Sequence, residues 1–247
     1  MKEGKVIGVG VGPGDVGLLT VKAVQILQEA DVICAPTWHL AKPSLALTIV
    51  RPVLDHRQQA PQIMELVFPM VEDKTQLEKA WTENANVIAE KAQEGKLVAF
   101  VVIGDPSLYS TFTYIQRTFR SKYPEIKIEV IPGVTSPSAC AAKAGMPLAI
   151  GRESLLIMPE FDGELARKVA GLVDNIVCMK VVNSFPQILR TLKESANFSD
   201  RSQVFIVKKC SFADERTWKG DMKDALQFQF SEDYFDLLMI RRKPKED

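Results

Sequence analysis

Seven consecutive apolar residues, from Leu97 to Ile103, form the clearest hydrophobic pattern in the chain. The run shows no alternation of polar and apolar positions, which is typical of a strand buried on both faces of a parallel sheet. The polar segment GDPSLY at residues 104–109 follows directly, and apolar positions at Leu108, Phe112 and Ile115 then indicate a helix. This order of strand, loop and helix predicts a ligand site at the carboxyl end of the strand.

The remaining apolar segments alternate between short strand-like runs and helical patterns, which predicts an α/β fold throughout. Strands are expected at residues 6–11, 31–36, 64–68, 126–131, 155–158, 176–182, 204–207 and 235–240. Helices are expected at residues 18–29, 45–50, 75–91, 134–144, 163–173 and 185–195. Asp73 or Thr75 is expected to cap the start of the helix at 75–91, and Gly95 to follow its end. The polar stretch at residues 120–125, with Pro124, suggests a break between a lobe at 1–120 and a lobe at 121–247.

Composition narrows the class of protein. The 31 Lys and Arg residues balance the 31 Asp and Glu residues, so no basic surplus favours nucleic acid or an anionic membrane. Neither a signal peptide nor a membrane span is expected. Four widely spaced cysteines indicate reduced thiols and a cytoplasmic location. His39 and His56 lack partners at ligand spacing, so no protein-bound metal is expected.

A glycine-rich segment, GPGDVG at residues 12–17, matches the dinucleotide fingerprint after a strand and before a helix. A dinucleotide-dependent oxidoreductase is therefore one alternative. However, that fingerprint requires an acidic residue near the end of the second strand, whereas Asp31 stands at the start of that strand, the end opposite the ligand. Gly8 and Gly10 lie inside the first strand, which predicts that something bulky packs flat against the backbone.

Two polar loop segments carry the candidate chemistry. Asp105 places a carboxylate at the mouth of the buried strand, where it serves either as a general base or as the cap of the next helix. Thr135 and Ser136 follow the strand expected at residues 126–131, and their hydroxyls can bind a ligand, cap a helix, or do both.

Three sequence blocks carry a family resemblance: GVGPGDVGLLTVKA near the N-terminus, GDPSLYSTF in the middle, and EVIPGVTSPSACAAKAGMPLA after it. Their order and spacing resemble the tetrapyrrole methylases, the class III S-adenosylmethionine-dependent methyltransferases. The central block is most similar to the enzymes that act on C20 of precorrin-2 or cobalt-factor II. One departure is Val16-Gly17, where the family usually has Pro-Glu.

The resemblance implies two α/β lobes with a cofactor cleft between them, a homodimer, and a methyltransferase of cobalamin biosynthesis. The tetrapyrrole substrate would lie over the first glycine-rich loop, with Asp105 as the base that removes a proton from the methylated carbon. Basic side chains for the substrate carboxylates would come from Lys42, Arg51, Arg57 or Lys180. The implied S-adenosylmethionine contacts are Pro13, Gly104, Asp105, Tyr109, Thr135, Ser136, Met179 and, on a looser alignment, Ala213.

Three alternatives remain open on sequence grounds. The first is another tetrapyrrole methylase, which would act on uroporphyrinogen III or on a later precorrin. The second is the dinucleotide-dependent oxidoreductase, and the third is a non-catalytic carrier of a tetrapyrrole or nucleotide. The sequence does not decide whether the substrate carries cobalt, because that metal belongs to the substrate.

Overall fold

The computed structural model describes residues 3–39, 41–182, 185–195, 197–227 and 234–242. The chain forms two compact α/β units, Met1–Thr135 and Ser136–Asp247. The boundary thus falls after residue 135 rather than after residue 120, where the polar stretch suggested it. The reason is that the strand at Lys127–Ile131 pairs with the first strand of the chain and completes the first sheet.

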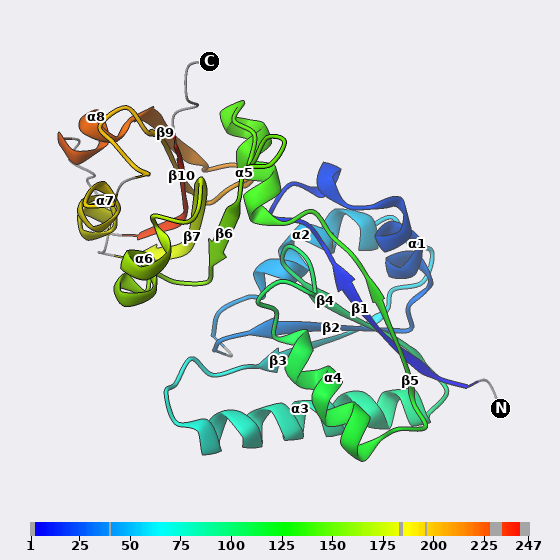
Figure 1. Ribbon diagram of the computed structural model, residues 1–247. Helices are drawn as coiled ribbons and strands as arrows, with labels where there is room; N and C mark the ends of the chain where they lie inside the picture. Colours follow the sequence, from blue (N-terminus) through cyan, green and yellow to red (C-terminus); the bar gives the residue numbers. More distant parts are fainter. Residues whose placement is uncertain (1–2, 40, 183–184, 196, 228–233, 243–247) are drawn as a thin grey trace. The chain divides into compact units, whose positions relative to one another are not determined.

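The first unit holds a five-stranded sheet in the order β3-β2-β4-β1-β5 (Figure 1). All neighbouring pairs are parallel, as the unbroken apolar run predicted for the central strand. Every residue of β4 is buried. The strands are β1 (Lys5–Gly10), β2 (Val32–Thr37), β3 (Gln62–Val67), β4 (Leu97–Val102) and β5 (Lys127–Ile131).

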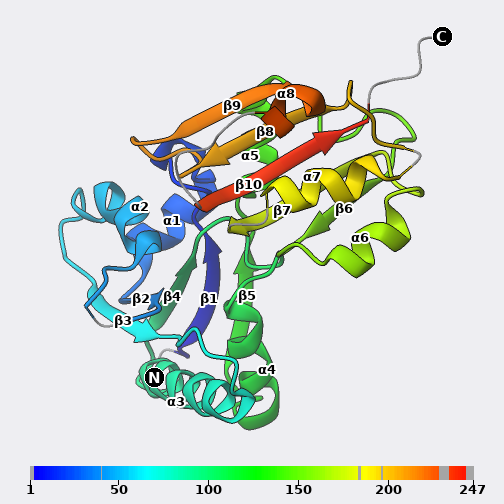
Figure 2. The ribbon, with the colours of Figure 1, turned by 90° about the vertical axis from the view of Figure 1, so that its left-hand side faces the viewer.

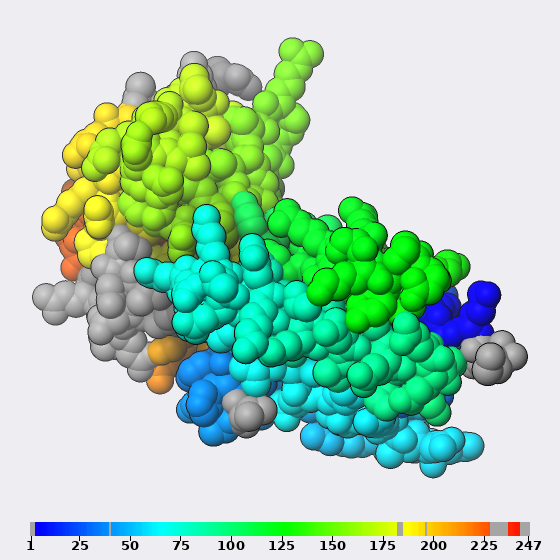
Figure 3. Space-filling model, turned by 90° about the horizontal axis from the view of Figure 1, so that it is seen from below, coloured from blue at the N-terminus to red at the C-terminus, as the bar shows by residue number. Residues whose placement is uncertain are grey.

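Helices cover both faces of this sheet (Figures 1 and 2). The first pair, α1 (Val21–Glu29) and α2 (Leu45–Leu54), packs on one face. The second pair, α3 (Lys74–Gln93) and α4 (Phe112–Lys122), packs on the other, and Figure 3 shows its outer surface in teal and green. Both α1 and α4 begin later than their sequence patterns indicated, because a 3₁₀ turn, η1 (Val16–Leu18), precedes α1 and an irregular loop precedes α4.

The ends of α3 follow the sequence signals. Asp73 is the N-cap, and its carboxylate accepts hydrogen bonds from the backbone N–H groups of Thr75 and Gln76. Gly95 follows the C-cap with φ of 79°, a conformation that glycine adopts without strain. Both expected caps are therefore confirmed. No helix among the described residues is long and apolar enough to cross a membrane.

The second unit holds another five-stranded sheet, in the order β6-β7-β10-β8-β9. β6 pairs parallel with β7, whereas β10 pairs antiparallel with β7 and β8, and β9 pairs antiparallel with β8. Its strands are β6 (Leu155–Met158), β7 (Asn175–Val182), β8 (Gln203–Lys208), β9 (Arg216–Asp221) and β10 (Tyr234–Arg241). The sheet is therefore mixed, unlike the first.

One helix, α5 (Ser136–Ala144), covers one face of the second sheet, and three helices cover the other. These are α6 (Gly163–Val169), α7 (Phe185–Lys193) and α8 (Met222–Gln227). The sequence patterns did not predict β9 or α8. The reason for β9 is that this edge strand, RTWKGD, is mostly exposed and has no apolar run.

Candidate functional site

The loops that follow β1 and β4 lie at the carboxyl ends of two neighbouring parallel strands in the middle of the first sheet. The chain leaves each strand across the other, because β1 connects past β4 to β2 and β4 connects past β1 to β5. In open α/β sheets, ligands bind at the carboxyl ends of the strands. The topology therefore places the candidate site where the sequence placed it, at residues 12–17 and 104–109.

Three glycines bring the loops after β1, β4 and β5 into backbone contact. A Cβ on Gly10 would lie 2.6 Å from the Gly133 nitrogen, and a Cβ on Gly133 would lie 2.2 Å from the Gly104 oxygen. Gly104 N also donates a hydrogen bond to Gly12 O over 2.8 Å. No side chain fits between these loops, so glycine is required at positions 10 and 133 for the close approach.

Asp105 joins two of these loops through both of its carboxylate oxygens. Oδ2 accepts a hydrogen bond from Gly133 N over 2.8 Å, and Oδ1 accepts one from Ser107 N over 2.7 Å. The Ser107 hydroxyl donates to Oδ1 as well. Asp105 does not cap the following helix, because α4 begins at Phe112 and its N-cap is Thr111. The expected capping role is therefore replaced by a link between loops.

These contacts determine the direction in which the pKa of Asp105 is shifted. Partial burial of the carboxyl raises its pKa, but the hydrogen bonds from Ser107 and Gly133 outweigh burial and hold the pKa below its usual value. A carboxylate with a lowered pKa and with both oxygens accepting hydrogen bonds is a poor proton acceptor near neutral pH. The geometry thus favours positioning over general base catalysis for this residue.

In the first glycine-rich loop, a side chain of the loop forms a hydrogen bond with the backbone of the same loop. Asp15 caps the 3₁₀ turn, and its Oδ1 accepts a hydrogen bond from Gly17 N over 2.8 Å. Asp31 lies at the opposite edge of the sheet, where its Oδ2 accepts a hydrogen bond from Leu97 N over 2.8 Å. The loop therefore lacks the acidic partner that a dinucleotide ribose requires at the ligand edge.

The glycines within β1 make room for the protein itself. A Cβ on Gly8 would lie 2.2 Å from the Phe112 ring, and Phe112 is fully buried on the α4 side of the sheet. The space beside Gly10, where a side chain would lie, is occupied by the backbone of Gly133, as described above. The expected flat approach of a bulky group is thus present at both positions, but the group is part of the chain rather than a ligand.

Positive backbone φ angles at residues other than glycine mark the same segments that the resemblance singled out. Tyr109 has φ of 50°, Lys180 51°, Lys209 53° and Ser211 66°. Such angles are strained for side-chain-bearing residues and cluster at functional sites. Tyr109 lies in the central loop, Lys180 follows Met179, and the other two precede Ala213. The strained positions therefore support a ligand-binding role for these three segments.

The structure brings together some of the predicted site residues within each unit. In the first unit, Gly104 and Asp105 contact the loop that leads to Thr135, and the buried Pro13 follows the bridge between Gly12 and Gly104. In the second unit, Ser136 begins α5, Met179 is half-buried against the core under α5, and Ala213 is exposed.

The basic residues considered for binding the substrate carboxylates lie in different parts of the structure. Arg57 is at the far edge of the sheet from the loops, where its Nη1 donates to Leu27 O over 2.7 Å and to Ala30 O over 2.8 Å at the end of α1. It is therefore a structural residue and no longer a candidate for substrate carboxylates. Lys42 is exposed after β2, at the ligand edge, and Lys180 is exposed in β7.

Sequence reasoning missed the roles of Gly10, Gly133 and Ser107. Gly133 was visible only as the end of a strand, and its contact with Gly10 joins segments far apart in the chain. Ser107 carried a local signal, because a serine two residues after an aspartate is the pattern of an Asx turn. That pattern could have identified the Asp105 contact with Ser107.

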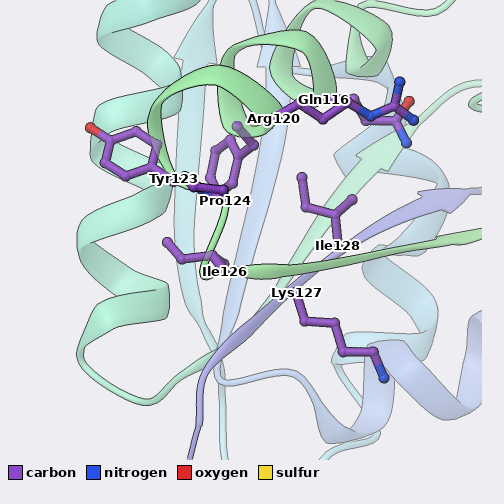
Figure 4. Close-up of a pocket in the computed structure, with 8 residues that line it drawn as sticks. Gln116, Arg120, Tyr123, Pro124, Ile126, Lys127 and Ile128 are labelled. Carbon is purple, nitrogen blue, oxygen red and sulfur yellow. The ribbon is translucent and has the colours of Figure 1, made fainter.

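Two hollows in the first unit lie away from this site. One of about 370 Å³ opens beside α4 and the start of β5, and it is lined by Arg120, Tyr123, Ile126 and Lys127 (Figure 4). This is the amino end of β5, so it faces the edge opposite the glycine-rich loops. Among the described residues, no group of three or more His, Cys, Asp or Glu side chains is placed to hold a metal.

Comparisons with known proteins identify the family of this chain. The family model for tetrapyrrole (corrin/porphyrin) methylases matches residues 5–226. The probable cobalt-precorrin-2 C(20)-methyltransferase of Methanocaldococcus jannaschii is 35% identical over 96% of both chains. The cobalt-precorrin-2 C(20)-methyltransferase of Salmonella typhimurium is 37% identical over 78% of this chain and 79% of its own.

The fold agrees as well. The crystal structure of uroporphyrin-III C-methyl transferase from Thermus thermophilus, complexed with S-adenyl homocysteine, covers 96% of this chain and 97% of its own with a TM-score of 0.66 at 20% identity. By its similarity to the relatives described above, the chain is a methyltransferase. It belongs to the tetrapyrrole (corrin/porphyrin) methylases.

Proposed function

We propose that this protein transfers a methyl group from S-adenosylmethionine to C20 of precorrin-2 or cobalt-factor II, during corrin ring biosynthesis. The observation that carries the proposal is the match, through both units, to a relative named for that reaction. Both of the relatives described above are named for cobalt-precorrin-2, which supports a substrate that already carries cobalt. Metal-free precorrin-2 is the second candidate substrate.

The donor fits the residues at the ligand edge. A Cβ on Gly104 would meet no atom within 4 Å, and its φ of +73° turns the backbone at the end of β4. An open, glycine-formed turn beside a strand end admits a ligand against the backbone. We propose that Pro13, Gly104, Asp105, Tyr109, Thr135, Ser136, Met179 and Ala213 contact the donor.

Methyl transfer depends mainly on how the protein positions the donor and the tetrapyrrole. S-adenosylmethionine supplies a methyl group that its sulfonium has already activated, so transfer depends on alignment of the two reactants. The contacts of Asp105 with Gly133 and Ser107 hold the loops after β4 and β5 in one arrangement. We therefore assign Asp105 to positioning and leave removal of the proton from the methylated carbon to solvent or to the substrate itself.

Assembly and location belong to the same proposal. We infer a homodimer from the family resemblance, and light scattering at micromolar concentration tests it. The four cysteines are buried thiols, and burial raises the pKa of Cys34 and Cys178 to about 12. Unreactive buried thiols support a reducing, cytoplasmic setting.

Calorimetry tests the donor assignment. We expect S-adenosylhomocysteine to bind with a micromolar or tighter Kd and about one site per chain, as enclosed cofactor sites commonly do. A nicotinamide dinucleotide serves as the comparison ligand. We expect it not to bind, because Asp15 forms a hydrogen bond within the glycine-rich loop that the dinucleotide would have to contact. Binding of the dinucleotide, with no binding of S-adenosylhomocysteine, would return the protein to the oxidoreductase class.

A further inference from the structure

Trp38 and His39 lie directly after β2, an inner strand of the first sheet. Exposure changes abruptly at this point: the Thr37 side chain is 6% exposed, whereas Trp38 is 54% exposed. Because β2 is the neighbour of β4, the carboxyl end of β2 opens on the same edge as the loop at residues 104–109. A half-exposed tryptophan thus stands at the ligand edge of the sheet.

Hydrogen bonds connect residues 37–39, which include these two side chains, to residues 41–44. The Thr37 hydroxyl lies 2.7 Å from Lys42 O, and Lys42 N donates a hydrogen bond to His39 O over 2.9 Å. Beyond the turn, Ser44 N donates to Glu65 Oε1 on β3 over 2.6 Å. The turn is therefore tied to its own strand and to the next one, so the two rings are presented from a defined position.

The hydrogen bonds also set the tautomer of His39. Ala41 N donates to Nδ1 over 3.1 Å, so Nδ1 carries no proton. In the neutral ring the proton is then on Nε2, which becomes a hydrogen-bond donor. The indole of Trp38 lies beside this ring, with centroids 5.8 Å apart and planes tilted by 51°. The turn thus offers a flat apolar surface next to an N–H donor.

Other exposed apolar side chains lie at the same edge of the sheet. Of the ten large hydrophobic residues exposed in the described part of the first unit, six lie in segments that follow the carboxyl ends of the strands. Exposed apolar side chains at one edge favour a binding site there. These six residues are Val16, Trp38, Met70, Val71, Ile103 and Tyr109.

We propose that Trp38, His39 and Lys42 recognise the tetrapyrrole. The Trp38 indole packs on the face of the macrocycle, and His39 Nε2–H donates to one of its peripheral carboxylates. The exposed Lys42 on the same turn adds a positive charge for those carboxylates. This assignment rests on the proposed function, since it presupposes a large, flat, conjugated and polyanionic substrate.

The test compares Trp38→Ala, Trp38→Phe, His39→Ala and His39→Gln with wild type. For each protein we would measure KM and kcat for cobalt-factor II, the Kd of S-adenosylhomocysteine by calorimetry, and the melting temperature. Trp38→Ala should raise KM about tenfold, the usual scale of an aromatic contact, and Trp38→Phe should raise it less. His39→Ala should raise KM about fivefold, as for one lost hydrogen bond, and the side-chain amide of His39→Gln should restore most of this. Neither kcat nor donor affinity should change.

His56 provides the matched control. It is the other histidine of the chain, it is exposed, and it precedes β3 at the edge opposite the ligand loops. His56→Ala should leave KM unchanged. An unchanged KM in both Trp38→Ala and His39→Ala would overturn the proposal, as would an equal rise in His56→Ala. If Trp38→Ala fails to fold, the KM values of Trp38→Phe and of the two His39 variants test the proposal instead.

A binding titration separates this inference from the proposed function. Cobalt-factor II absorbs visible light, so its binding can be followed without turnover. Binding by wild type that weakens in Trp38→Ala and His39→Ala supports the turn even if no methyl group is transferred, and in that case the proposed reaction fails alone. Normal transfer with unchanged variants leaves the reaction in place and removes the turn from the substrate site. Failure of wild type to bind cobalt-factor II at all overturns the inference.

Discussion

The Asp105 carboxylate accepts the Gly133 N–H over 2.8 Å and so ties the loop after β4 to the loop after β5. Its second oxygen accepts both the backbone N–H and the hydroxyl of Ser107. A single side chain therefore holds two of the loops at the ligand edge. Since the account assigns this residue to positioning, its substitution separates positioning from proton transfer.

Asp105→Asn keeps the size of the side chain but leaves a single acceptor oxygen, so one of the two contacts must be lost. We expect the free energy of unfolding to fall by about 1 kcal/mol, the scale of one hydrogen bond. The Kd of S-adenosylhomocysteine should rise about tenfold, the equivalent of about 1.4 kcal/mol. With saturating donor, kcat should fall less than tenfold. Calorimetry, thermal unfolding and single-turnover transfer give these values.

Ser107→Ala is the control for Asp105→Asn, because it removes one hydroxyl contact and keeps the carboxylate. Its effects should be smaller in the same direction. A general base would behave differently, with kcat falling by roughly two to four powers of ten while stability and donor affinity stay normal. That outcome would restore Asp105 to the catalytic residues.

The pH dependence of stability follows from the lowered pKa of Asp105. A carboxyl group whose pKa is lower in the folded state stabilises the fold above its unfolded pKa, and this contribution disappears as the pH falls through the folded value. The difference in unfolding free energy between wild type and Asp105→Asn should be constant above about pH 5. It should shrink as the pH falls below about 4, the ordinary aspartate value. Denaturant melts across this range provide the measurement, and a difference that changes between pH 6 and 8 would contradict the assigned direction.

Gly133→Ala should destabilise the first unit, because the new Cβ would lie 2.2 Å from the Gly104 oxygen. The neighbouring atoms are backbone, so they cannot move aside as a flexible side chain would. A loss of about 2 kcal/mol is typical of such overpacking. The matched control is Gly171→Ala, since a Cβ there meets no atom within 4 Å. Thermal melts of both variants should separate them, and equal melting temperatures would contradict the close packing of the three loops.

Arg57→Ala tests whether Arg57 has a structural role, whereas Lys42 binds the substrate carboxylates. Its guanidinium donates to two carbonyls at the end of α1, so its loss should cost about 2 kcal/mol of stability, as for hydrogen bonds from a charged group. The KM for the tetrapyrrole should not change. Lys42→Ala, at the ligand edge, should raise KM and leave the melting temperature unchanged. A raised KM in Arg57→Ala, with normal stability, would return Arg57 to the substrate site.

Local patterns predicted much of the fold. The apolar run at β4 indicated a buried parallel strand, and all six residues of β4 are buried. Asp73 and Gly95 marked the ends of α3, because helix caps depend on residues only a few positions apart. The polar edge strand β9 escaped notice, because its pairing with β8 rather than its own sequence makes it a strand.

The site was predictable in part. The loops after β1 and β4 were predictable as loops at strand ends, because a glycine-rich segment after a buried strand is a local feature. The partners of Gly10 and Asp105 were not found, because both contact Gly133, more than a hundred residues after Gly10 and 28 after Asp105. The boundary between the units was missed for the same reason, since only the pairing of β5 with β1 places residues 121–135 in the first unit.

The most direct test of the account is to identify the carbon that receives the methyl group. The protein would be incubated with S-adenosylmethionine labelled with carbon-13 in the methyl group and with cobalt-factor II, and the product examined by mass spectrometry and NMR. A parallel reaction would use the metal-free compound. We expect one added methyl group, at C20, with the cobalt-loaded substrate reacting faster. A methyl group at any other ring carbon, or an unchanged tetrapyrrole alongside normal donor binding, would contradict it.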